Sequence, residues 1–147
     1  MAVESYSGFI QKHNMLFGIL ICALLTSILF SIIPSGFFFI ADIFLVIGNC
    51  IGLYITFRNR KKSQSHIKTG IIVGVAGSVL ALLLLGFFDW ILYSINYGFD
   101  FILFLQYAIV LFGYYGIMYV LVGIILGYLF GYFYRKNEDI DKESPLF

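Results

Sequence analysis

The sequence predicts an all-α integral membrane protein, built as a four-helix transmembrane bundle. Hydrophobic residue types make up 61% of the 147 residues and charged types only 12%, with a mean hydropathy of +0.98. So little polar surface cannot cover a soluble globule. The apolar residues fall into long runs, and all nine lysines and arginines lie outside those runs. Both observations favour helices that cross a lipid bilayer.

The first two runs are expected to form an antiparallel hairpin. Residues 14–33 and 37–57 each have about the twenty residues that a helix needs to cross the hydrocarbon core. The sequence Pro34-Ser35-Gly36 between them predicts a tight turn. A cleaved signal peptide is the alternative for the first run, but its apolar region is usually only about 7 to 15 residues long.

The second half of the chain is expected to form two longer helices. One span covers residues 69–88 and extends to about residue 95, and the other covers residues 101–134, including an extension beyond the outer membrane surface. Residues 89–115 are rich in aromatic side chains, which favour the membrane interface. A re-entrant segment is the alternative for this stretch.

The positions of the cations predict the orientation. They occur in three segments: Lys12 before the first span, a group from Arg58 to Lys68 between the second and third, and a group from Arg135 to Lys142 after the last. With four spans all three segments lie on one side, which the positive-inside bias makes cytoplasmic. We therefore expect a multi-pass cell-membrane protein with two cytoplasmic tails, residues 1–13 and 135–147, around a transmembrane domain of residues 14–134.

Small residues recur every four positions in all four runs. This spacing places them on one helix face, where another backbone can approach closely. The predicted packing glycines are Gly48, Gly52, Gly70, Gly74, Gly123, Gly127 and Gly131. Thr56 continues the series of the second run, Ser78 continues that of the third, and Ala23, Ser27 and Ser31 form the series of the first run. They could serve contacts within one chain or between two copies. The run that starts at Gly18 also resembles the run that starts at Gly70, which suggests a parallel internal repeat.

No sequence motif indicates catalysis, a cofactor or a metal site, so we expect the protein not to be an enzyme. His13 and His66 fall in polar segments and are expected to be solvated. Cys22 and Cys50 fall in adjacent spans and are expected to be buried free thiols rather than a redox pair. The basic residues Arg58, Arg60, Lys61 and Lys62 are expected to meet lipid headgroups.

Asp42 is the strongest polar candidate, because an ionisable residue within a span is costly and is often functional. Its carboxyl group could be protonated, could accept hydrogen bonds from Asn49, Ser31, Ser27 or a tyrosine, or could meet a cation. Such a site could bind a cation or proton, or it could only hold helices together.

The short Pro-Ser-Gly hairpin, the basic middle loop and the Gly-xxx-Gly spans resemble small four-span membrane proteins of unknown function found in archaea and some bacteria. The resemblance implies the fold but no activity. Two functions are expected as alternatives: a packing or assembly module that binds membrane lipid and either a second copy or a partner membrane protein, or a minimal cation or small-solute channel or carrier that uses Asp42. No nucleic-acid partner is expected.

Overall fold

The computed structural model describes residues 13–32, 38–59 and 65–143, with side chains for residues 13–31, 43–59 and 65–138. These residues are all-helical and contain no strand, which confirms the predicted helical class. The helices are α2 (Asn14–Ile32), α3 (Phe38–Arg58), α4 (His66–Tyr97), and a last helix made of α5 (Phe101–Leu111), the π-helical turn η1 (Phe112–Gly116) and α6 (Ile117–Glu143).

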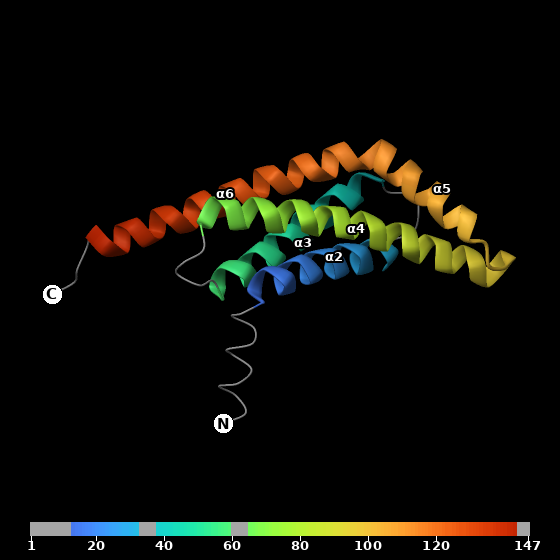
Figure 1. The fold of residues 1–147 in the computed structure, drawn as a ribbon, viewed down its shortest axis with the longest axis horizontal. Coiled ribbons are helices and arrows are strands. Elements are labelled where there is room, and N and C mark those ends of the chain that lie inside the picture. The colour runs from blue at the N-terminus through green and yellow to red at the C-terminus, as the bar shows by residue number, and fades with distance from the viewer. Residues whose placement is uncertain (1–12, 33–37, 60–64, 144–147) are drawn as a thin grey trace, which may run out of the picture.

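The last helix is continuous but bent. The backbone stays right-handed helical at both ends of η1, with φ and ψ of −66° and −35° at Phe112 and −63° and −47° at Ile117. Figure 1 shows the change of direction between α6 and α5 at this point. A π-helical turn is a common cause of such a bend. The bend allows one long helix to follow α4 along most of its length.

Helix α4 lies at the centre of the fold. It contacts α2, α3, α5, η1 and α6, whereas α5 contacts only α4 and η1 among the described elements. Figure 1 shows α4 between α6 on one side and the pair α2 and α3 on the other. We call the part formed by α2, α3, α6 and α4 up to Phe88 the inner bundle. Residues 89–111, which continue past it, are the outer extension.

Three helices are long and apolar enough to cross a membrane: Asn14–Ser31, His66–Tyr97 and Phe101–Glu138. The apolar stretch of α3 whose side chains are described, Ile43–Arg58, is shorter. The outward-facing side chains of the helices are mostly apolar, with Leu16, Ile72 and Ile125 all more than half exposed. A helical protein with an apolar surface is the kind that lipid solvates.

The interior of the fold is unusually rich in small polar residues. The buried polar residues are Asn14, Thr26, Ser27, Asn49, Thr56, Thr69 and Ser78. Among the residues with described side chains, large apolar groups form two small buried clusters, one of Leu45, Leu82, Leu85 and Tyr119 and the other of Leu53, Phe57 and Val73. The inner bundle therefore packs mainly through small residues rather than through a core of large ones.

The helix ends differ in places from the expected spans. Helix α4 begins at His66 rather than Thr69, and α6 continues to Glu143, beyond the expected end of the last span at residue 134. The link between α4 and α5 comprises residues 98–100, and Gly98 has a φ of +97°, which favours glycine. The predicted Pro34-Ser35-Gly36 turn lies outside the described residues.

Candidate functional site

The glycines of α6 lie against glycines of α4 in the same chain. Gly127 faces the carbonyl group of Gly70, and Gly123 faces that of Gly74. A Cβ atom on Gly123 would lie 2.5 Å from the carbonyl oxygen of Gly74, closer than real Cβ atoms come to any atom. Such an approach of two backbones is typical of membrane helices that associate through small residues and Cα–H···O contacts. The α4–α6 contact is thus closed to any side chain.

A second close contact joins α2 and α3. Gly52 lies against Gly18, with a Cβ on Gly52 reaching 2.5 Å from the Gly18 carbonyl oxygen. Gly48 lies against the Cys22 carbonyl oxygen, 2.9 Å from an ideal Cβ. As residue numbers rise along α2 they fall along α3, and the same is true of α4 and α6. Each glycine series is therefore occupied by a neighbouring helix of the same chain.

The side chain of Asn49 connects three helices in the middle of the inner bundle. Its Oδ1 accepts a hydrogen bond from the Cys22 thiol of α2 at 3.3 Å, and its Nδ2 donates to the Ser78 hydroxyl of α4 at 3.0 Å and to the Leu45 carbonyl at 3.2 Å. Asn49 is 1% exposed, so an unpaired amide there would be costly. Both ends of the amide are satisfied, which fixes the register of α2, α3 and α4.

Two further polar contacts support this arrangement. The Ser27 hydroxyl lies within hydrogen-bond distance of the carbonyl oxygens of Ala23 in its own helix, at 2.7 Å, and of Ala81 in α4, at 3.3 Å. Near the start of α2, the Asn14 Nδ2 donates to the Thr56 carbonyl of α3 at 3.1 Å. These bonds hold α2 against α4 and α3 at two levels of the bundle.

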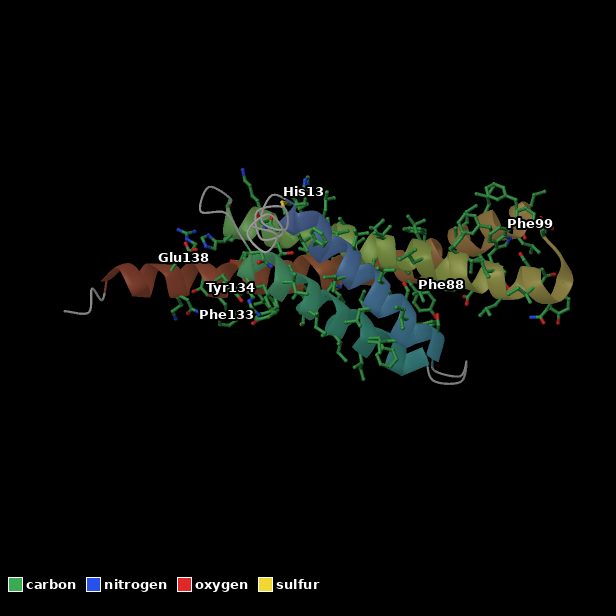
Figure 2. The ribbon with its side chains drawn as sticks, turned by 90° about the horizontal axis from the view of Figure 1, so that it is seen from below. His13, Phe88, Phe99, Phe133, Tyr134 and Glu138 are labelled. Carbon is green, nitrogen blue, oxygen red and sulfur yellow. The ribbon has the colours of Figure 1, made fainter. Side chains whose placement is uncertain are left out.

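An aromatic stack closes the end of the bundle that carries Arg58, Lys68 and Arg135, which we call the inner end. Phe57 of α3 stacks on Tyr134 of α6 with a centroid distance of 4.8 Å and on His66 of α4 at 6.5 Å. The His66 Nε2 atom lies 3.1 Å from a carboxylate oxygen of Glu138, at an angle outside that of a hydrogen bond, so the contact is an ion pair when His66 is protonated. Figure 2 shows Tyr134 and Glu138 at this end. His66 is thus mostly buried rather than solvated as predicted.

The outer extension is held together by a different kind of contact. Trp90 of α4 packs against Phe99 and Phe104 at centroid distances of 4.9 and 5.7 Å, and its indole N–H donates to the Asp100 carbonyl oxygen. The Asp100 carboxylate caps α5 by accepting from the backbone N–H of Ile102 at 2.9 Å. The aromatic residues predicted for the membrane interface thus form a cluster between α4 and α5.

The predicted polar site is centred on Asp42, which belongs to α3 and whose side chain lies outside the described residues. Asn49 and Ser27 have the other partners given above. Ser31 is exposed and donates to the Ser27 carbonyl at 2.8 Å, so the third position of the predicted α2 series lies outside the helix contact.

The other candidate residues can be placed more simply. Arg58 is exposed at the inner end, whereas Arg60, Lys61 and Lys62 lie outside the described residues. Cys22 is buried, Cys50 is partly exposed, and both thiols are free. No group of three His, Cys, Asp or Glu residues lies together in the described part of the chain as a metal site requires.

Sequence reasoning included Thr56 and Ser78 in the small-residue series of their helices, and both take part in contacts between helices. It did not identify Gly18 as a partner of Gly52, and it did not place Asn49 on the packing face of α3. One signal could have placed Asn49 there. Leu45, Asn49, Gly52 and Thr56 follow one another at spacings of four, three and four, which places them on one helix face. Considering small and polar residues as one class would have shown this face.

Comparison with protein-family models, with curated proteins and with solved structures gives no match.

Proposed function

We propose that the protein is a non-catalytic membrane subunit, in which two antiparallel helix hairpins form a closed module that assembles with another membrane-embedded chain. In this proposal α2 and α3 form one hairpin, α4 and the last helix form the other, and the chain crosses the membrane four times. Both termini are then cytoplasmic. The position of Arg58, Lys68 and Arg135 supports this orientation, because each lies within two residues of the aromatic stack at one end of the bundle.

The observation that carries the proposal is the occupation of the glycine series within the chain. Since Gly70, Gly74, Gly123 and Gly127 already contact one another, the bundle needs no second copy to satisfy them. The same contacts leave no space between α4 and α6 for a solute path. A packing role is therefore better supported than conduction along this contact.

A partner would then meet the opposite face of α6. Met118, Leu121 and Ile125 are 61%, 48% and 57% exposed on that face, and a side chain at Gly113 in η1 would have open space around it. Only 17% of the most apolar 18-residue stretch of this span is buried in the fold, whereas 44% of the corresponding stretch of α4 is buried. The last helix thus offers the largest uncovered surface of the candidate spans.

Cysteine cross-linking in native membranes tests this assignment. In a Cys22→Ser, Cys50→Ser background, Leu121→Cys and Ile125→Cys should form cross-links to a second copy or to a partner protein. Ile72→Cys on α4 and Leu20→Cys on α2, which are 51% and 48% exposed, are the matched controls and should not. Equal cross-linking from all four positions, or none from α6, would contradict the proposal.

A cation or proton carrier is the second candidate, and one feature of the register favours it. Leu45 of α3 and Leu85 of α4 belong to one buried cluster. Asp42 precedes Leu45 by three residues and Asp89 follows Leu85 by four, so both acidic residues belong to the next turn toward the outer end. Two carboxylates at one level could share a proton or bind a cation.

Reconstituted vesicles separate the two candidates. If the protein is a carrier, wild-type protein conducts protons, sodium or potassium, and Asp42→Asn abolishes the flux while thermal stability is retained. If Asp42 only binds helices together, no flux is seen, and Asp42→Ala lowers stability by about 1 kcal/mol whereas Asp42→Asn does not.

A further inference from the structure

The outer extension stands apart from the rest of the fold. Its helix α5 contacts only α4 and η1 among the described elements and has no buried residue. Helices α2 and α3 make no contact with α5 among the described elements. Whatever covers the extension must therefore come from outside the described chain.

The extension continues well past the ends of α2 and α3. The contact of Ser27 with Ala81 sets the level of α2 beside α4, and α2 ends five residues later, at Ile32. Beyond Phe88, α4 runs on for nine more residues, or about 13 Å at the rise of an α-helix. Figure 2 shows Phe88 near the end of the α2–α3 pair and Phe99 at the far tip.

The surface of the extension is apolar around most of its circumference. Ile95, Phe99, Ile102 and Ile109 are 75%, 77%, 66% and 71% exposed. On α5 the exposed apolar residues Phe101, Ile102, Leu105, Tyr107, Ile109 and Val110 cover more than half of the helix circumference. A docking site for one protein would leave the remaining faces polar, whereas lipid surrounds a helix on all free sides.

The composition of the extension matches the membrane interface. Trp90, Tyr93 and Tyr97 combine apolar rings with polar groups, as residues at the headgroup level do. No lysine or arginine occurs between Thr69 and Tyr134. Exposed apolar residues also occur on both sides of η1, with Ile102 and Ile109 on α5 and Ile117 and Met118 on α6.

We infer that the outer extension is a lipid-binding element, which lies in the outer leaflet at the boundary between phospholipid headgroups and acyl chains. The inference rests on the proposed membrane role of the chain. Figure 2 shows that the α2–α3 pair runs obliquely to α4 and α6. If α2 and α3 stand across the bilayer, α4 is tilted, and the extension leans into the interface instead of standing in water.

Tryptophan fluorescence in phosphatidylcholine vesicles tests the inference, since Trp90 is the single tryptophan of the chain. Two reporters carry Trp90→Phe with either Ile95→Trp or Phe99→Trp. The control within the bilayer is Trp90→Phe with Leu24→Trp, because Leu24 is 45% exposed near the middle of α2, away from the partner face of α6. Quenching by shallow nitroxide lipids should exceed quenching by deep nitroxide lipids about twofold at both reporters, with the reverse order at Leu24→Trp. Iodide in the aqueous phase should quench none of the three strongly.

Wild-type protein provides a measurement that needs no substitution. Trp90 is 8% exposed, but nitroxide quenching acts over a distance, so shallow nitroxide lipids should also quench Trp90 more than deep ones. This result holds even if a reporter variant fails to fold.

Two results would overturn the inference. Strong iodide quenching at Ile95→Trp and Phe99→Trp, without nitroxide quenching, would place the extension in water. Protection from both quenchers would show that protein covers it. If Leu24→Trp also escapes nitroxide quenching, the proposed membrane role fails as well. If Leu24→Trp is quenched and the reporters are not, only the lipid-binding inference fails.

Discussion

In the inner bundle α4 meets α6 backbone to backbone, whereas in the outer extension the same helix meets α5 through aromatic rings. The first contact depends on missing side chains, as at Gly74 and Gly123, and the second on the largest side chains available, as at Trp90 and Phe104. Only one turn of α4 separates Gly86, the last glycine of the helix, from Trp90. One helix thus uses two kinds of packing along its length.

In the proposed membrane arrangement, the difference follows from what surrounds each part. Lipid chains are as apolar as leucine, so burial of apolar surface does not draw helices together inside a bilayer, and close van der Waals contact must do so. At the interface, where water reaches the helices, burial of aromatic surface is favourable. The inner bundle should consequently tolerate added volume poorly, and the outer extension should tolerate loss of volume poorly.

The largest effect is expected for Gly127→Leu. A leucine there must push α6 away from Gly70, because the carbonyl group of Gly70 occupies the space. The free energy of unfolding should fall by about 3 kcal/mol, the upper part of the range for overpacking. Gly113→Leu is the matched control in the same long helix, because nothing lies within 4 Å of an added Cβ. Thermal unfolding in detergent should separate the two variants. Equal losses would show that the glycine series is not a packing contact.

Asn49→Ala is expected to cost less, on the order of 1 to 2 kcal/mol. It removes the bonds to Cys22 and Ser78 and leaves their buried groups without a partner. Asn96→Ala removes only an exposed hydrogen bond to Leu92 one turn back in α4, at 2.9 Å, and should leave stability unchanged. Melting temperatures of the two variants should be measured under the same condition. They compare the loss of an amide that joins helices, at Asn49, with the loss of one that does not, at Asn96. A neutral Asn49→Ala would refute its role in fixing the register.

Asp100→Ala should act locally in the outer extension. Loss of the N-terminal cap of α5 should lower the stability of this helix by about 1 kcal/mol. Asp100→Asn should retain most of that stability, because asparagine caps helices as well as aspartate. Hydrogen exchange should therefore quicken at Ile102 and Leu103 in the alanine variant, with no change at Asn49. Faster exchange throughout the inner bundle would show that the two parts unfold together.

Glu138→Gln is expected to have the smallest effect. The Glu138 side chain is 46% exposed, and partly exposed ion pairs contribute from nothing to about 1 kcal/mol. Phe57→Ala, which removes the ring between His66 and Tyr134, should cost several times more in the same chemical-denaturation assay. The reverse order would make the ion pair rather than the aromatic stack the main closure of the inner end.

The fold class could be predicted because composition and hydropathy determine it. The packing face of the last helix could also be predicted, since Gly123, Gly127 and Gly131 repeat at a helical spacing. All three glycines are buried in the structure. The sequence could not show which neighbour each face meets, because the same spacing suits a contact within the chain and a contact between copies. Only the structure shows that Gly127 faces Gly70.

The polar contacts were harder to predict than the glycine contacts. A serine or asparagine in a span has several acceptors within reach, including carbonyl groups of its own helix. Ser31 bonds to Ser27 in this way, although its spacing suggested a place in the helix contact. Asn49 bonds across helices because Cys22 and Ser78 reach it from both sides, which depends on the level at which three helices meet.

Magic-angle-spinning NMR of glycine-labelled protein in lipid bilayers tests the central claim most directly, namely that the glycine contacts lie within one chain. In uniformly labelled protein, cross-peaks should join the Gly74 Cα to the Gly123 carbonyl carbon and the Gly70 Cα to the Gly127 carbonyl carbon. These cross-peaks should vanish in a mixture in which some chains carry only labelled glycine Cα and the others only labelled glycine carbonyl carbon. Their persistence in the mixture would show that the contacts join two chains, which would contradict the account.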